Sequence, residues 1–149
     1  EKYRSDYEGN NLQQEDALLH IAIPTDVEQL CIRDCKNKNG ELSTWLSSVL
    51  CYIPYKCPID WFGLENNNFQ DRDIHRICAG LLNRVEQSNL CGLSLCNNSY
   101  ITDKCIAVLL KTISKKCHKL QFLRLSGCTK LTNKTCQHIL EFYGKTYSD

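Results

Sequence analysis

The chain has 149 residues, of which 42% are hydrophobic, and a formal net charge of +1. This length and apolar content suit one domain with its own core, and the near-neutral, interspersed charge predicts no nucleic-acid partner. No apolar run reaches the roughly 18 residues needed to span a bilayer, so we expect no direct membrane insertion.

Residues 1–26 precede the first recurring pattern, and we interpret them as an N-terminal cap segment. Within this segment, EDALLHIAI (Glu15 to Ile23) predicts a helix or a short strand that covers the open end of the structure that follows. The chain begins with Glu1 and contains no methionine. We therefore expect a fragment or a processed product.

From residue 27 onward, one nine-residue pattern occurs four times. Aliphatic or aromatic residues occupy its first, fourth and sixth places, and Cys or Asn occupies its ninth. The four stretches are VEQLCIRDC from Val27, IDWFGLENN from Ile59, LCGLSLCNN from Leu90 and LQFLRLSGC from Leu120. Their starts are 32, 31 and 30 residues apart, and this near-constant spacing indicates stacked structural units.

Each nine-residue pattern predicts a short strand whose alternate side chains enter the core. The ninth residue lies where the chain turns away from the strand. A buried Asn can bond neighbouring backbone groups there, and Cys can fill the same space with a weak S–H donor. The predicted inward residues are Val27, Leu30, Ile32 and Cys35; Ile59, Phe62, Leu64 and Asn67; Leu90, Leu93, Leu95 and Asn98; and Leu120, Leu123, Leu125 and Cys128.

Behind each strand, apolar residues at helical spacing predict an amphipathic helix. Asp103 and Asn133 stand near two helix starts, where a side-chain oxygen can accept from unpaired backbone amides. The helices would return the chain to the next strand, so that a parallel sheet lies on one side and helices on the other. The apolar helix positions are Leu42, Trp45, Leu46, Val49 and Leu50; Ile74, Ile77, Leu81 and Leu82; Ile101, Ile106, Leu109, Leu110 and Ile113; and Leu131, Cys136, Ile139 and Leu140.

The run from Leu93 to Leu140 resembles the cysteine-containing subtype of the leucine-rich repeat family, as found in the substrate-receptor arms of F-box proteins. The residues that follow the family consensus most closely are Cys117, Leu120, Leu123, Leu125, Cys128, Leu131, Thr132 and Asn133. The resemblance covers roughly residues 27–143. It implies an α/β leucine-rich-repeat solenoid of about four strand–helix repeats, with the parallel sheet on the concave face, so that residues 27–149 form one domain with the cap segment.

The resemblance also implies a function. It suggests a non-enzymatic protein–protein interaction module, acting as a scaffold or substrate-recognition subunit of a hetero-complex, with protein partners and no cofactor. In its small size and its roughly four repeats the chain also resembles the mitochondrial ATP synthase coupling factor B family. This second resemblance implies an alternative function, that of an accessory subunit of a mitochondrial membrane complex. A third hypothesis, an oxidation-sensitive thiol switch, depends on Cys31 and Cys96.

Strand residues that do not enter the core should form the inner face, at the third, fifth, seventh and eighth places of each pattern. Trp61 and Phe122 share the third place, and we expect both to be exposed. Gly92 between them predicts a shallow gap for a partner side chain, whereas in the alternative interpretation Trp61 folds against the edge of the core. Exposed aromatic residues flanked by charges are typical of binding hot spots. We predict a partner-binding surface made of Trp61, Phe122, Arg33, Arg124, Asp34 and Glu65.

The eleven cysteines are a high and odd number, whereas small disulfide scaffolds usually carry an even number and a thin core. We therefore expect mostly reduced thiols that behave as small buried hydrophobic residues. This predicts an intracellular protein, in the cytoplasm or nucleus, with the mitochondrion as the alternative.

Neither a metal site nor an active site is predicted. The sequence has no C-x-x-C pair, and its four histidines are scattered. Helix capping explains Asp71 and Asp73, and no histidine is expected on the inner face beside a thiol. The basic helical side is interpreted as a solvated surface, comprising His75, Arg76, Arg84, Lys115, Lys116, Lys119 and Lys134.

Overall fold

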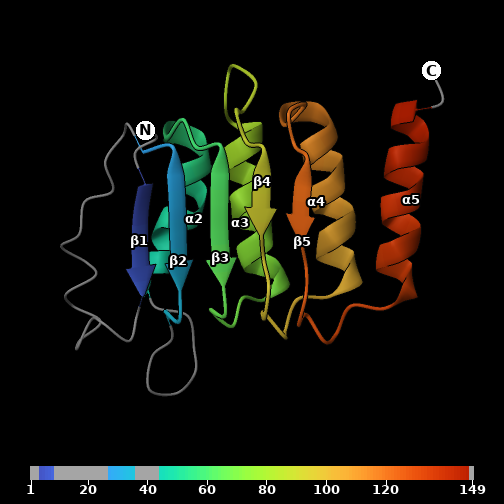
Figure 1. The fold of residues 1–149 in the computed structure, drawn as a ribbon, viewed down its shortest axis with the longest axis horizontal. Coiled ribbons are helices and arrows are strands. Elements are labelled where there is room, and N and C mark those ends of the chain that lie inside the picture. Colours follow the sequence, from blue (N-terminus) through green and yellow to red (C-terminus); the bar gives the residue numbers. More distant parts are fainter. Residues whose placement is uncertain (1–3, 9–26, 36–43, 148–149) are drawn as a thin grey trace.

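The computed structural model describes residues 4–8, 27–35 and 44–147, which form a layer of strands backed by a layer of helices (Figure 1). The predicted cap element from Glu15 to Ile23 lies outside these residues. In chain order the elements are β1 (Arg4–Glu8), β2 (Gln29–Arg33), α2 (Thr44–Lys56), β3 (Trp61–Glu65), α3 (Asp71–Leu82), β4 (Gly92–Ser94), α4 (Asp103–Lys116), β5 (Phe122–Arg124) and α5 (Asn133–Tyr147).

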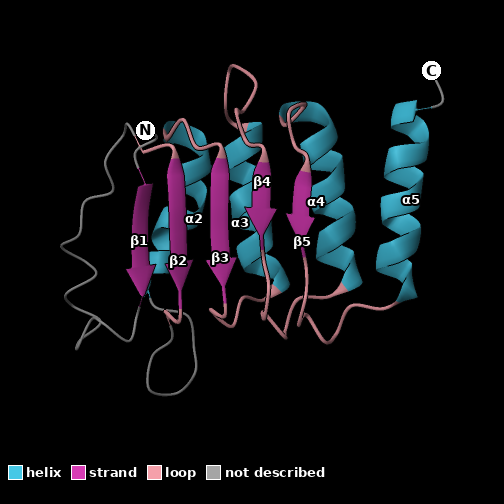
Figure 2. Ribbon diagram, in the orientation of Figure 1, coloured by secondary structure: helices cyan, strands magenta, loops and turns pink. Residues whose placement is uncertain are grey.

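The strands form one parallel sheet whose order, β1 to β5, is their order in the chain. The helices lie together on one face of this sheet, and the other face is left open by the described elements (Figure 2). The predicted α/β class with a parallel sheet is therefore confirmed. Helices occupy all four of the segments where apolar spacing predicted them.

The described sheet has one strand more than the sequence predicted. β1 pairs with β2 in parallel, with Arg4 opposite Gln29 and Glu8 opposite Arg33. Its sequence, RSDYE, lacks the aliphatic spacing of the later strands. Pairing between strands uses backbone groups that nearly every residue supplies, so a polar strand leaves little trace in a search for apolar periodicity.

The core lies between the sheet and the helices, and the residues predicted to point inward form much of it. From Val27 to Asn98 all twelve of the predicted strand and turn residues are buried. In the last unit Cys128 is buried, but Leu123 and Leu125 are only half-buried. The difference follows from position, because β5 has no further strand–helix unit beside it in the described part of the chain.

Two buried asparagines join successive units at the turn after each strand. The side-chain oxygen of Asn67 accepts from the backbone N–H of Cys35 at 2.9 Å, and its amide donates to the carbonyl of Ile32 at 2.9 Å. Asn98 repeats this one unit later, accepting from Asn67 N–H at 2.9 Å and donating to Leu64 at 2.7 Å. The predicted role of the ninth residue is confirmed.

Cys128 takes the ninth place in the last unit. Its thiol donates to the carbonyl of Leu95 at 3.1 Å, where Asn98 uses its amide toward Leu64. The sulfur thus occupies the same site as a weak donor, which agrees with the sequence-based expectation.

The residue just before each ninth place has left-handed backbone geometry. The φ angles are 57° at Asp34, 55° at Asn66, 61° at Asn97 and 77° at Gly127. Asn and Asp tolerate this region better than other non-glycine residues. β2, β3, β4 and β5 are therefore all followed by the same turn, which directs the ninth side chain back into the core.

Arg84 corrects one of the sequence-based assignments, because it is not part of the solvated helical surface. Its side chain is buried, and Nη1 donates to the carbonyls of Pro54 at 3.1 Å and Cys57 at 3.2 Å. These carbonyls lie at the C-terminal end of α2, where a helix leaves acceptors unpaired and favours a positive charge. Arg84 therefore closes the end of the neighbouring helix.

Helices α2 and α3 are in close contact at Gly80. A Cβ atom at this position would stand 2.2 Å from the backbone oxygen of Cys51 and 2.7 Å from Cγ of Pro54. Only glycine fits this contact without moving one of the helices.

We therefore expect Gly80→Ala to lower the free energy of unfolding by about 1–3 kcal/mol, because overpacking against backbone outweighs the better helix propensity of alanine. The matched control is Gly144→Ala in α5, where no atom lies within 4 Å of the added Cβ. This control should raise the stability by up to about 1 kcal/mol. Urea unfolding of both variants measures the difference, and equal effects would contradict the close approach.

The hydrogen bonds that Asn67 and Asn98 make to the preceding unit, here called the asparagine ladder, lead to a second stability prediction. Asn98→Ala removes the partners of Asn67 N–H and the Leu64 carbonyl, both buried. We expect it to lower the free energy of unfolding by about 2–4 kcal/mol. The exposed Asn89→Ala should change it by no more than about 0.5 kcal/mol. Similar unfolding midpoints for the two variants would show that the ladder contributes little.

Candidate functional site

A groove on the open face of the sheet brings together four of the six predicted site residues. It has a volume of about 280 Å³. The residues that line it come from β2, β3 and β5, and they are Cys31, Ile32, Arg33, Trp61, Gly63, Glu65 and Arg124. Arg33, Trp61, Glu65 and Arg124 were predicted from their places in the pattern, whereas the other three lining residues, Cys31, Ile32 and Gly63, were not predicted as binding residues.

The sheet register arranges the outward side chains of this face in rows. Gln29, Trp61, Gly92 and Phe122 form the first row across β2 to β5, and the second row is Cys31, Gly63, Ser94 and Arg124. Side chains two residues apart on a strand share one face, so Arg33 and Glu65 extend the same surface in a third row. Equivalent places of the sequence pattern are therefore neighbours in space.

Trp61 lies across Gly92 and is half-buried, whereas the sequence predicted an exposed ring. A Cβ atom at Gly92 would stand 2.2 Å from Cε3 of the indole. The predicted gap at Gly92 is therefore wrong, because the tryptophan ring itself fills that space. Gly92 was the residue from which the gap was predicted. The space left by its missing side chain holds the Trp61 ring, so no opening remains for a partner.

Arg124 holds the other side of the indole. Its guanidinium carbon lies 5.1 Å from the ring centroid, which is within the range of a cation–π contact. This contact joins β3 to β5 over the intervening β4. It limits the rotation of Trp61 and fixes the position of a positive charge at the groove.

Glu65 supplies the one carboxylate among the groove-lining residues of the described chain. Its Oε1 accepts from the hydroxyl of Ser94 at 2.7 Å, and Arg33 stands opposite it in the strand register. Ser94 is fully buried, so the bond anchors the carboxylate from below.

The remaining two predicted residues lie outside the groove lining. Phe122 is 54% exposed and occupies the row of Trp61, two strands away. Asp34 lies in the left-handed turn after β2, where its carboxylate accepts from the side-chain amide of Asn66. Eighth-place residues therefore belong to the turn edge, and only the third, fifth and seventh places contribute to the open strand face.

All eleven cysteines lie in described segments, and none of them forms a disulfide. Burial raises the pKa of Cys117 to about 11, and it also raises the pKa values of Cys78, Cys105 and Cys128. These thiols are protonated at neutral pH and therefore poor nucleophiles. Cys31 at the groove is half-buried, and no histidine lines the groove beside it in the part of the chain that the structure describes.

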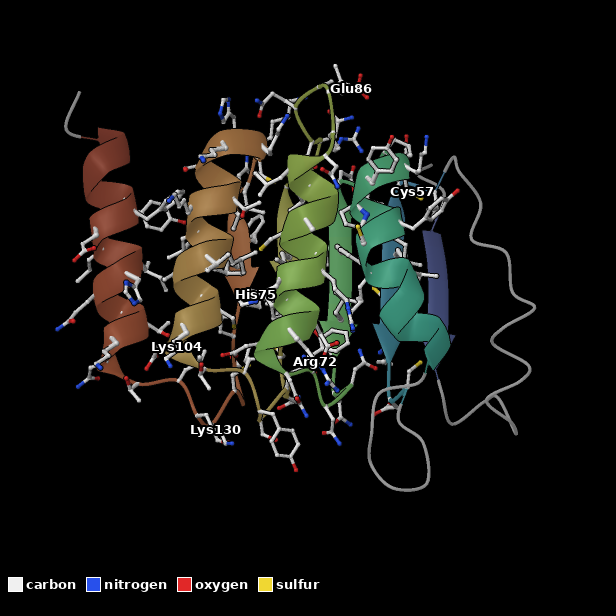
Figure 3. All side chains as sticks on the ribbon, turned by 180° about the vertical axis from the view of Figure 1, so that it is seen from behind. Cys57, Arg72, His75, Glu86, Lys104 and Lys130 are labelled. Carbon is white, nitrogen blue, oxygen red and sulfur yellow. The ribbon has the colours of Figure 1, made fainter. Side chains whose placement is uncertain are left out.

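The described segments hold no group of three or more His, Cys, Asp or Glu side chains arranged to bind a metal ion. His75 lies on the helical side, away from the groove (Figure 3). His118 is exposed, with Nε2 3.1 Å from the carbonyl oxygen of Ser114. The histidines that can be located therefore do not converge on a site.

Acidic residues along the turn edge are occupied by hydrogen bonds to the next unit. Asp71 accepts from the backbone N–H of Thr102 at 2.7 Å, and Asp103 accepts from that of Thr132 at 2.9 Å. The hydroxyls of Thr132 and Thr135 also donate to Asp103, each at 2.6 Å. Asp103 thus caps the entrance to the next helix, whereas the sequence predicted that it would cap its own.

These bonds lower the pKa of both carboxyls. Burial alone would raise the pKa of Asp71, but the bonds from Thr102 outweigh it and hold the pKa below its usual value. At Asp103 the bonds from Thr132 and Thr135 lower the pKa to about 2. Both groups are ionised at neutral pH and act as structural acceptors, so neither supplies a proton for general acid catalysis.

Aspartate 73 is the third carboxylate of this region, and it caps its own helix as predicted. Its Oδ2 accepts from the backbone N–H of Gln70 at 2.8 Å, and its Oδ1 pairs with Arg76 at 2.9 Å. The carboxylates Asp71 and Asp73 are therefore both engaged in holding helix starts.

Comparison of the chain with models of protein families gives no match, and comparison with curated proteins gives none either. No helix in the described segments combines the length and the apolar character needed to cross a bilayer. The groove and its neighbours on the open face are therefore the observations from which function is argued.

The low pKa of Asp103 predicts acid sensitivity of the last interface. The folded pKa of about 2 lies below the ordinary value of 3.8, so the stabilisation is complete above about pH 4 and is lost as the pH falls toward 2. We expect Asp103→Asn to lose less stability than the wild type across this interval. Denaturant unfolding at pH 6, 4 and 2 measures both curves, and parallel curves would contradict the assignment.

Proposed function

We propose that the protein is a non-enzymatic protein–protein interaction module that binds its partner through the open strand face. The proposed architecture is a leucine-rich-repeat solenoid of about four strand–helix repeats, with this sheet face concave. The in-chain order of the parallel strands, the recurring left-handed turn and the asparagine ladder support it. Such a stack serves as a scaffold or a substrate-recognition subunit of a larger complex.

The observation that carries the proposal is the pairing of Trp61 with Arg124 beside the groove, together with the exposed ring of Phe122. Tryptophan and arginine are enriched at interface hot spots because they combine large contact area with directional bonds. Trp61 is already held in one position by Gly92 and Arg124. A partner would therefore bind it with little further loss of side-chain entropy.

The proposal includes no catalytic step. The groove offers a thiol at Cys31, but the lining residues include no histidine to act as its base. The turn-edge carboxylates are held by hydrogen bonds to threonine. Recognition needs only the shape and the charges described above.

The test is affinity purification with mass spectrometry of the wild type and the Trp61→Ala, Phe122→Ala double variant. We expect one set of partners to be lost, by about tenfold or more, because the two aromatic residues of the face are removed. A ubiquitin-ligase adaptor among the proteins captured by the wild type would indicate substrate recognition. Capture of a mitochondrial respiratory assembly would indicate the alternative role as an accessory subunit.

The matched control is Tyr52→Ala, Tyr143→Ala, which removes two exposed aromatic residues from α2 and α5. Both double variants are first compared with the wild type by thermal unfolding. If the strand-face variant is folded and retains every partner, or if the control loses the same set, the binding surface is not the strand face.

A further inference from the structure

We infer that the groove binds an acidic side chain of an extended peptide segment in the partner, with Arg124 and the indole N–H of Trp61 as its donors. The inference rests on the proposed function and adds the chemistry of the ligand. It requires unused donors, a positive charge with no carboxylate opposite it in the sheet, and a spacing that an extended peptide can match.

Arg124 supplies the first unused donor. Its side chain contacts the Trp61 ring, and within the described residues it makes no hydrogen bond or ion pair. A cation–π contact uses the positive charge but none of the N–H groups. The guanidinium therefore keeps the planar donor edge that matches a carboxylate in a bidentate geometry.

Trp61 supplies the second donor. Its Nε1 lies beside Gly63, 3.5 Å from where a Cβ atom would stand, on the groove side of the ring. Within the described residues no acceptor pairs with this indole N–H. The ring cannot easily turn away, because Gly92 and Arg124 fix it from two sides. A donor that is held in place beside the groove can bond an acceptor that a ligand brings.

The positive charge of Arg124 favours a negative ligand, because Ser94, which is neutral, stands opposite it in the strand register. The described lining of the groove carries two guanidinium groups, Arg33 and Arg124, and one carboxylate, Glu65. In the strand register Arg33 lies between Glu8 of β1 and Glu65 of β3, so acidic residues flank it on both sides. Ser94 already donates to Glu65, and Arg33 stands opposite Glu65 in the register. Arg124 on β5 is therefore the cation that remains for an incoming carboxylate.

The spacing on β5 defines the peptide more closely. Phe122 and Arg124 are two residues apart on one face of the strand, so their Cα atoms stand about 6.7 Å apart. An extended peptide presents residues i and i+2 at the same spacing. The ligand should therefore carry an apolar side chain for Phe122 and an acidic side chain two positions away for Arg124.

The experiment uses the two tryptophans of the full chain, Trp61 at the groove and Trp45 in α2. They give two indole signals in a ¹⁵N–¹H spectrum, and Trp61→Phe assigns them. The probe is a blocked six-residue peptide with leucine and glutamate two positions apart. We expect it to shift the Trp61 indole and the Arg124 Nε–H signals but not the Trp45 indole. The glutamine analogue of the peptide should bind at least about tenfold more weakly.

The matched variants are Arg124→Gln and Lys104→Gln. Lys104 carries the same charge on the helical side, near the start of α4 (Figure 3). We expect Arg124→Gln to weaken the glutamate peptide at least about tenfold and Lys104→Gln to leave it unchanged. Equal weakening by both variants would indicate an effect of net charge alone and would overturn the site.

The other outcomes separate this inference from the proposed function. Equal binding of the glutamate and glutamine peptides would overturn the acidic ligand while leaving a strand-face peptide site. An equal Trp61 shift with acetate at the same concentration would reduce the groove to a site for small anions. Absence of a Trp61 shift at millimolar peptide would overturn the inference, and partner capture with the aromatic double variant would still decide the proposed function by itself.

Discussion

The buried amides of Asn67 and Asn98 are the constraint on which the rest of the structure depends. β4 and β5 are only three residues long, and backbone bonds between successive turns, such as that from Asn66 N–H to the carbonyl of Cys96, satisfy only part of the polar groups there. Each asparagine joins an N–H and a carbonyl of the preceding turn, 31 to 35 residues earlier. Because the bonds tolerate little displacement, they hold the units in one register, and that register creates the rows of side chains on the open face.

The same ladder explains why the last unit differs from the others. Its ninth residue is Cys128, whose thiol offers one weak donor in place of the amide. No further unit covers its other flank within the described chain, so Leu125 is half-buried while its counterpart Leu95 is fully buried. In a stacked architecture, stability is approximately a sum over units and their interfaces. Within the described chain the β5–α5 unit has one such interface. Its local opening should therefore cost less free energy than opening of an inner unit.

The sequence predicted the features that recur in every unit, but it did not predict contacts that depend on one particular neighbouring residue. Apolar spacing located the inward residues, the four helices and the bonding role of Asn98, because each recurs with the same period. Arg84 was misread, because its carbonyl partners at Pro54 and Cys57 lie about 30 positions earlier, with no pattern linking them. The orientation of Trp61 was missed for a related reason: it depends on the absence of a side chain at Gly92, on the adjacent strand.

The groove is a joint product of several units, and this connects its chemistry to the stacking. Trp61 belongs to β3, Gly92 to β4 and Arg124 to β5, so the cation–π contact exists only while three strands stay in register. No single unit contains both the indole and the guanidinium. The ladder at the turn edge therefore holds the open face rigid, and this rigidity lowers the entropy that a partner must remove on binding. Stability at the turns and recognition at the strands are consequences of the same register.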